Sequence, residues 1–314
     1  MKKNIVFMGT PDFSVPSLEA LINSDFRVLA VYTQPDRKAG RGQQVTSSPV
    51  KKFAVSHGLE VVQIEKFKIE GTVEEMDAFS PDLIVVAAFG LLLPSEVLSV
   101  PKLGCINVHP SLLPMHRGAS PIATTILCGD NVAGVTIMMM DAGMDTGPIL
   151  NQRDVPVADN DTTGSLGAEL ARLGAQLLIE TLPSWIEGRI KPKPQDESRA
   201  TATRMIKKED GEVDWRLSTV ELWRRIRAFD PWPGSYTIWR GHRLKLTKVL
   251  PIYGERSDKP GKVIVLPTNE PAALGVQTGD GVLGLVRLQL AGKRELTAEE
   301  FIRGQRDFIG SILL

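Results

Sequence analysis

An alternation of apolar runs and helix-like segments fills the amino-terminal half of the sequence and restricts the folds open to it. The strand-like runs are NIVFMG, RVLAVYT, EVVQI, PDLIVVAAF, GCINVH and GVTIMMM. The segments with apolar residues at helical spacing are SLEALINS, SPVKKFAVSHG and TVEEMDAF. Because strands and helices alternate, we expect an α/β fold with a doubly wound, mainly parallel sheet of Rossmann-like type.

The sequence changes character after Gly188. GRIKPKPQDESRATATR has prolines, mixed charges and few apolar residues, which predicts an extended linker, and STVELWRRIRAFD then predicts a helix. Short strand-like runs follow between Gly- and Pro-containing turns: SYTIWR, HRLKLTKVL, GKVIVL, AALGVQT and GLVRLQL. Such short strands favour a small β-barrel of the OB type, and a β-sandwich stays open.

The length of the chain, 314 residues, exceeds the usual size of one hydrophobic core, so we expect two domains. We place them at residues 1–188 and 208–314, with a basic linker at 189–207. Cys105 and Cys128 are too few for a disulfide scaffold, and the first apolar run is much shorter than a signal peptide requires. These features predict a cytoplasmic protein.

The net charge of zero conceals an uneven distribution. Residues 1–188 carry 14 basic and 21 acidic side chains, whereas residues 189–314 carry 23 and 16. This asymmetry indicates a polyanionic partner for the basic half, although solvated surfaces also vary in charge without any partner. Charge alone leaves both interpretations open.

One short passage, GCINVHPSLLPMHRGASPI, concentrates polar side chains at a predicted strand end. Alternation along a strand directs Asn107 and His109 to the same face, and Pro110 ends the strand just beyond them. The carboxyl ends of strands are where open α/β sheets hold their active sites. An Asn amide can donate to a developing oxyanion, and a His can donate to it or carry a proton.

Several other kinds of chemistry are poorly supported. GTPDFS lacks the second and third glycines of a dinucleotide-binding loop, so a nicotinamide-dependent dehydrogenase is a distant alternative. The sequence has no G-x-S-x-G nucleophile elbow, and its four histidines do not follow a metal-ligand spacing. We therefore expect electrostatic and acid–base catalysis without a metal.

A second polar cluster occurs in MMMDAGMDTGPIL, where Asp141 and Asp145 follow a predicted strand in a glycine-containing loop. Either carboxylate could orient or charge the imidazole of His109 and assist deprotonation of an attacking amine. A turn or helix-cap role is the simpler expectation for Asp141.

The motifs GTPDFSVPSLEAL, QPDRKAGRG, AFGLLLP, GCINVHPSLLPMHRGASPI and GVTIMMMDAGMDTGPIL together resemble the methionyl-tRNA formyltransferase family over essentially the whole chain. The N-x-H pair, SLLP and a later Asp are also shared with glycinamide ribonucleotide and amino-sugar formyltransferases. The segment QPDRKAGRG, here called the basic loop, and the carboxyl-terminal segment WRRIRAFDPWPGSY favour the tRNA enzymes.

The resemblance implies a role for each matching residue. It gives Asn107, His109 and Asp145 as the catalytic trio, and it gives a folate-contacting loop that consists of Ser111, Leu112, Leu113 and Pro114. In the family reaction, 10-formyltetrahydrofolate passes its formyl group to the amino group of methionine on initiator tRNA. The resemblance also implies a monomer.

The tRNA contacts are expected from basic residues in both halves of the chain. They are Arg37, Lys38 and Arg41 in the basic loop, Lys207 as the last residue of the linker, and Lys208 directly after it. A solvated flexible turn is the simpler interpretation of the basic loop. Two alternatives to the tRNA enzyme stay open, namely a formyltransferase for a nucleotide-linked amino sugar and a nonenzymatic RNA-binding protein, and the latter leaves the catalytic trio unexplained.

Overall fold

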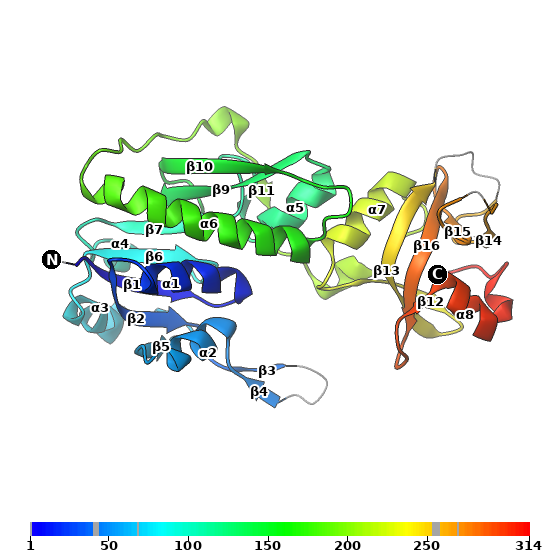
Figure 1. The fold of residues 1–314 in the computed structure, drawn as a ribbon, viewed down its shortest axis with the longest axis horizontal. Helices are drawn as coiled ribbons and strands as arrows, with labels where there is room; N and C mark the ends of the chain where they lie inside the picture. The colour runs from blue at the N-terminus through cyan, green and yellow to red at the C-terminus, as the bar shows by residue number, and fades with distance from the viewer. Residues whose placement is uncertain (1, 40–43, 68, 253–257, 269) are drawn as a thin grey trace. The chain divides into compact units, whose positions relative to one another are not determined.

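The computed structural model describes residues 2–39, 44–67, 69–252, 258–268 and 270–314. The chain forms two compact units (Figure 1). Unit 1 comprises residues 1–121, 132–156 and 167–204, and unit 2 comprises residues 122–131, 157–166 and 205–314. Among the described residues, no helix combines the length and the apolarity that crossing a bilayer demands.

Unit 1 is built on a seven-stranded sheet with the order β10-β9-β7-β6-β1-β2-β5. Its strands are β1 (Asn4–Gly9), β2 (Arg27–Thr33), β5 (Val61–Gln63), β6 (Leu83–Ala87), β7 (Cys105–His109), β9 (Val132–Met139) and β10 (Ile149–Pro156). All neighbouring pairs are parallel except those that β9 makes with β7 and β10. The predicted mainly parallel α/β sheet is confirmed.

Helices cover both faces of this sheet. They are α1 (Val15–Ile22), α2 (Pro49–Ser56), α3 (Ile69–Ala78), α4 (Ser95–Leu98) and α6 (Thr163–Ile186), whereas α5 (Pro121–Cys128) lies almost wholly in unit 2. On one face, Met76 of α3 and Val97 of α4 pack in a cluster with Cys105 of β7. On the other face, a side chain at Gly174 of α6 would meet Val108 at 2.7 Å, so this glycine permits the helix to lie close to β7. Both faces of the central strands are therefore buried under helices, which accounts for the apolar sequences of these strands.

Two small strand pairs complete unit 1. The hairpin β3 (Arg37–Ala39) and β4 (Gln44–Thr46) contains the first residues of the basic loop. The second pair joins β8 (Arg117–Gly118) in parallel to β11 (Ala202–Thr203). Through this second pair, the segment predicted to be a linker contacts the passage that follows β7.

Unit 2 contains a six-stranded antiparallel sheet that packs against α7 (Thr219–Ala228) and α8 (Ala298–Gly304). Its strands are β12 (Ser235–Trp239), β13 (His242–Ile252), β14 (Val263–Val265), β15 (Leu274–Gln277), β16 (Val282–Leu290) and β17 (Leu296–Thr297). The curled single sheet confirms the barrel-like prediction over the sandwich.

The final residues connect the two edges of this sheet. Leu313 donates its backbone N–H to Gly261 next to β14, and Ile238 of β12 exchanges backbone hydrogen bonds of 3.0 and 3.2 Å with Leu314. Inside the sheet, the rings of Trp239, Phe301 and Phe308 contact one another edge to face at 5.0 to 5.7 Å. Closure therefore surrounds one aromatic core.

Candidate active site

The carboxyl end of β7 holds two polar side chains that are almost fully buried. Asn107 is 9% exposed and His109 is 4% exposed. Asn107 lies opposite Met138 and His109 opposite Thr136 in the pairing with β9. Because buried polar groups are costly unless they find partners, both side chains need hydrogen bonds or a function at this strand end.

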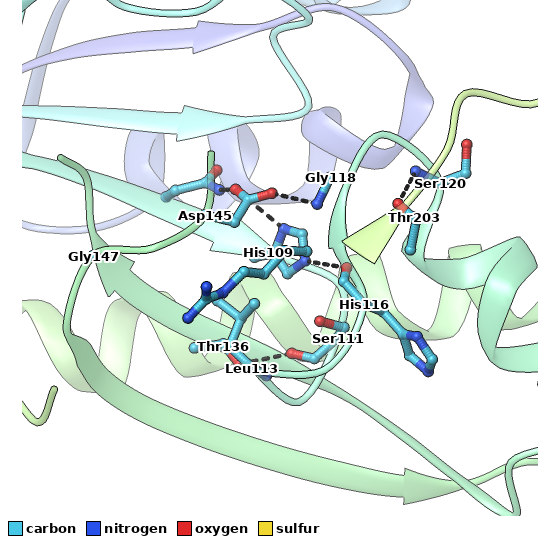
Figure 2. Close-up of polar contacts among 12 residues, drawn as sticks. His109, Ser111, Leu113, His116, Gly118, Ser120, Thr136, Asp145, Gly147 and Thr203 are labelled. Carbon is cyan, nitrogen blue, oxygen red and sulfur yellow. Dashed lines mark hydrogen bonds and ion pairs between the residues drawn. The ribbon is translucent and has the colours of Figure 1, made fainter. Parts of the chain in front are cut away.

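Asp145 completes the group from the loop between β9 and β10 (Figure 2). Its Oδ1 lies 3.4 Å from the Asn107 Nδ2 and 3.6 Å from the His109 Nδ1. Its Oδ2 accepts a hydrogen bond of 2.8 Å from the backbone N–H of Gly118. Asp145 has a φ of +57°, a conformation that a non-glycine residue adopts at a cost unless its surroundings hold it. The three residues expected to be catalytic thus converge on one carboxylate.

His109 is oriented by a second contact. Its Nε2 lies 3.2 Å from the backbone carbonyl oxygen of His116, and only a protonated Nε2 can donate to that oxygen. The Nδ1 therefore faces Asp145. Burial lowers the pKa of the His109 imidazolium, while the Asp145 charge and the His116 carbonyl oppose this effect by favouring the protonated ring.

Two neighbouring groups do not share this chemistry. Burial raises the pKa of the Cys105 thiol to about 12, which keeps it protonated and makes it a poor nucleophile. Asp141 accepts hydrogen bonds from the Gly143 N–H at 3.0 Å and from the Thr146 hydroxyl at 2.6 Å. Asp141 thus has the expected turn role and leaves Asp145 as the acidic member of the site.

The loop Ser111–Pro114 is a fixed wall beside His109. The Ser111 hydroxyl donates to the Met115 carbonyl oxygen at 2.6 Å, and the Leu113 N–H donates to the Thr136 hydroxyl at 3.1 Å. Leu112 packs against Gly134, where any side chain would meet it at 2.4 Å. Leu113 and Pro114 are buried. Folate contact by these four residues stays a prediction.

The basic residues expected to contact tRNA are divided between the units. Arg37 is exposed in β3 and donates to the Gln34 side chain at 2.8 Å. Lys38 also lies in β3, but its side chain is outside the described part, as is the whole of Arg41. Lys207 and Lys208 are exposed in unit 2. Their RNA contacts stay predictions.

Sequence reasoning missed several groups that hold the site. The Gly118 N–H is one, and Gly118 has a φ of +107° with space for no side chain, since a Cβ would lie 2.9 Å from the Thr203 carbonyl oxygen. Arg117 and Gln195 are two more, because the Gln195 side chain donates to the Asp145 carbonyl oxygen and accepts from the Arg117 guanidinium. A signal for Arg117 existed, because it lies in the same motif as His109, but nothing local distinguished Gln195 within a polar linker.

Comparison with known proteins agrees with this geometry. Residues 2–182 match the Formyl transferase family, and residues 205–306 match the Formyl transferase C-terminal domain. Methionyl-tRNA formyltransferase of Chloroflexus aurantiacus is 45% identical over 301 residues, which are 96% of each chain. The enzyme of the same name from Halalkalibacterium halodurans is 44% identical and covers 98% of each chain.

Solved structures share the fold at lower identity. HypX from Aquifex aeolicus in complex with tetrahydrofolic acid has a TM-score of 0.62 at 20% identity, and the match covers 96% of this chain but only 47% of HypX. The sugar 3N-formyl transferase WlaRD has a TM-score of 0.65 at 19% identity, with 94% and 99% of the two chains covered. The full-length relatives are decisive: this chain belongs to the methionyl-tRNA formyltransferase family.

Proposed function

We propose that this enzyme transfers the formyl group of 10-formyltetrahydrofolate to the amino group of methionine on initiator methionyl-tRNA, the reaction that prepares this tRNA for translation initiation. The observation that carries the proposal is the convergence of Asn107, His109 and Asp145 at the carboxyl end of β7 in a member of this family.

Each member of the trio suits one part of an amide-forming transfer. The acceptor amine forms a bond to the formyl carbon, negative charge develops on the formyl oxygen, and the amine nitrogen must lose a proton. The bond between the formyl carbon and the folate nitrogen then breaks, and that nitrogen takes up a proton as tetrahydrofolate leaves. The Asn107 amide can donate to that oxygen without titrating, and the His109 ring, with Asp145 behind it, stabilises charge or carries the proton. Asp145 is the base nearest to both side chains and is our candidate for managing the proton.

The residues present fit a reduced folate as the formyl donor, which supplies an activated formyl carbon. The site offers a neutral amide donor for a carbonyl oxygen, while the leucines and the proline of Ser111–Pro114 provide an apolar wall. Apolar walls with few well-placed polar groups are typical of sites for cofactor-sized molecules. We infer that this wall holds the donor next to Asn107.

We infer that the acceptor is held electrostatically. A tRNA is a polyanion, and Lys207 and Lys208 are exposed in the basic half of the chain, while Arg37 is exposed in the hairpin of unit 1. The cytoplasmic location and the monomeric state stay predictions. Size-exclusion chromatography with light scattering tests the monomeric state.

The direct test compares acceptors. The purified protein is incubated with 10-formyltetrahydrofolate and either methionyl-tRNA, uncharged tRNA or a nucleotide-linked amino sugar, and the formylated product is measured. We expect product with methionyl-tRNA alone. Formylation of the amino sugar in preference to methionyl-tRNA would contradict the proposed function while leaving the formyl-transfer chemistry in place.

A further inference from the structure

The extended segment Lys193–Thr203, here called the strap, is fixed against the active-site loops of unit 1. Lys193 forms two backbone hydrogen bonds with Ile149, of 2.8 and 2.9 Å. Further along, the Thr201 hydroxyl accepts a hydrogen bond of 2.8 Å from the His116 N–H. The Thr201 carbonyl oxygen accepts one of 2.9 Å from the Arg117 N–H. The strap thus borders both the loop that contains Asp145 and the loop that contains Gly118.

The side chain of Gln195, in the strap, points toward the loop that contains Asp145. Every residue from Lys191 to Arg199 is exposed except Gln195, which is half-buried. The Gln195 Nε2 donates to two backbone carbonyl oxygens, that of Asp145 at 2.8 Å and that of Gly147 at 2.7 Å. A single amide therefore holds the backbone on both sides of Thr146.

The other end of the same amide is also fixed. The Gln195 Oε1 accepts from the Arg117 Nε at 3.1 Å and from its Nη2 at 2.8 Å. Arg117 is 9% exposed and forms a bidentate pair with Glu197, with N–O distances of 2.7 and 3.0 Å. A guanidinium only donates, so it fixes the Oε1 toward Arg117 and the Nε2 toward the Asp145 loop.

These contacts restrain the part of the loop that is under strain. Asp145 is in the left-handed region, and Gly147 cannot accept a side chain because a Cβ would lie 1.9 Å from the Met139 carbonyl oxygen. A conformation of this kind persists only where the surroundings hold it. In this molecule the Gln195 amide holds the carbonyl of Asp145, and the Gly118 N–H holds its carboxylate.

We propose that Gln195, oriented by Arg117 and Glu197, is a positioning residue that holds Asp145 within reach of Asn107 and His109. This inference rests on the proposed function for its kinetic readout. Gln195 acts through the backbone of the Asp145 loop, so its loss should lower kcat by displacing a catalytic group, without removing a contact to either substrate. A displacement of about 1 Å in a catalytic group costs on the order of 10²-fold in rate.

The test uses the full-length protein with Gln195→Ala and Gln195→Glu. Gln195→Glu keeps an acceptor for Arg117 but places a carboxylate oxygen against the two loop carbonyls. It therefore tests the contacts of the Nε2 separately from those of the Oε1. We expect both variants to lose about 10- to 100-fold in kcat, with KM for both substrates within about twofold. The matched control is Gln176→Ala, which removes an exposed amide on α6 whose Nε2 donates to Glu180 at 2.9 Å, and which should keep full activity.

A double-mutant cycle identifies the route of the effect. If Gln195 acts through Asp145, Gln195→Ala should cause little further loss in an Asp145→Asn background. Amide hydrogen exchange gives a readout that is independent of turnover, since the Gly118 N–H should lose protection in Gln195→Ala when the carboxylate moves. Additive losses in the cycle, full kcat in both variants, or unchanged Gly118 protection would overturn the proposal.

The two proposals can fail separately. A wild-type protein that does not formylate methionyl-tRNA contradicts the proposed function, and the exchange experiment still decides the positioning role. An active wild type with equally active Gln195 variants contradicts the positioning role alone. Thermal unfolding of each variant accompanies the kinetics, and a lowered Tm with unchanged kcat assigns Gln195 to stability and likewise overturns the proposal.

Discussion

The carboxyl end of β7 in unit 1 and the lysine pair of unit 2 hold their polar side chains in opposite ways. Asn107 and His109 are nearly buried and have defined partners, whereas Lys207 and Lys208 are exposed. Buried donors with fixed partners are preorganised for charge that develops in a transition state. Exposed lysines instead attract a polyanion over a distance and depend on salt. Changes in the first region should alter kcat, and changes in the second should alter affinity.

The largest expected effect comes from substitutions in the active site at the end of β7. Asp145→Asn and Asn107→Ala should each lower kcat by about 10²–10³ while the Kd for tRNA changes little, because removing one preorganised group costs about 3–4 kcal/mol of transition-state stabilisation. Steady-state kinetics and a binding titration measure the two quantities.

The control for this prediction is Asp141→Asn in the same loop. Its side-chain oxygen can still accept from Gly143 and Thr146, so activity should stay close to wild type. A defect of Asp145→Asn that appears only in KM would instead assign Asp145 to substrate binding.

The next effect concerns the exposed side. Changing Lys207→Ala together with Lys208→Ala should raise the Kd for tRNA about 10- to 100-fold near 0.1 M salt and reduce the log–log salt slope by about one to two units. The kcat at saturating tRNA should not change. The measurement is a Kd series across salt concentrations.

A pair of exposed lysines elsewhere in unit 2 supplies the control for charge. Lys259→Ala with Lys293→Ala removes the same net charge from exposed positions. If that pair lowers the slope equally, general electrostatic attraction explains the binding and Lys207 and Lys208 have no special place in it.

A smaller effect should fall on the stability of unit 2. Gly261 has a φ of +85°, and a Cβ there would lie 2.5 Å from the carbonyl oxygen of Leu313, the residue whose backbone N–H donates to Gly261 and helps to close the barrel. Gly261→Ala should lower the free energy of unfolding by about 1–3 kcal/mol, measured by urea denaturation. Gly241→Ala has a similar φ but open space around it, so it should cost less. Equal losses would show that backbone strain, and not the closure contact, sets the cost.

The smallest expected effect depends on pH. Asp280 accepts from the Thr219 N–H at 2.8 Å, and this backbone hydrogen bond is the main reason that its pKa lies below the ordinary value. A depressed pKa in the folded state means that the carboxylate stabilises the protein above its unfolded pKa of about 3.9, and that this contribution is lost as the pH falls through the folded value.

Because Asp280 is exposed, solvent screens this contribution, and Asp280→Asn should therefore lower the Tm at pH 7 by only about 1–2 °C, as expected for the loss of about 0.5 kcal/mol. The difference from wild type should shrink as the pH falls below about 4 and the wild-type side chain becomes protonated. Calorimetry at a series of pH values measures it. A difference that stays constant down to pH 2 would exclude ionisation as its source.

Local patterns were sufficient for much of the fold and for half of the site. Apolar runs identified six of the seven strands in the main sheet of unit 1 but not β10 (Ile149–Pro156), and the one-residue spacing of Asn107 and His109 correctly brought their side chains together at a strand end. The direction of β9 could not be read in this way, because an antiparallel strand and a parallel strand have the same period. The single curled sheet of unit 2 likewise depends on pairings that no local pattern specifies.

The remaining features of the site depend on contacts between distant residues. Asp145 reaches His109 because its loop is held in a left-handed conformation, and the restraint comes from Gln195, fifty positions later in the sequence. Arg117 appeared in a notable motif, but its partner Glu197 is eighty positions away. Periodicity and motif spacing describe neighbours along the chain, so they cannot identify pairs of this kind.

The strap has a consequence for protein engineering by recombination. A designer who exchanges carboxyl-terminal modules between homologous enzymes would naturally cut at Gly188, where α6 has just ended. That junction would import a foreign Gln195 and Thr201 against the native Asp145 and His116. A junction after Arg204 keeps the strap with the loops that it contacts. Chimaeras joined at the later position should inherit the turnover of the amino-terminal parent together with the tRNA preference of the other.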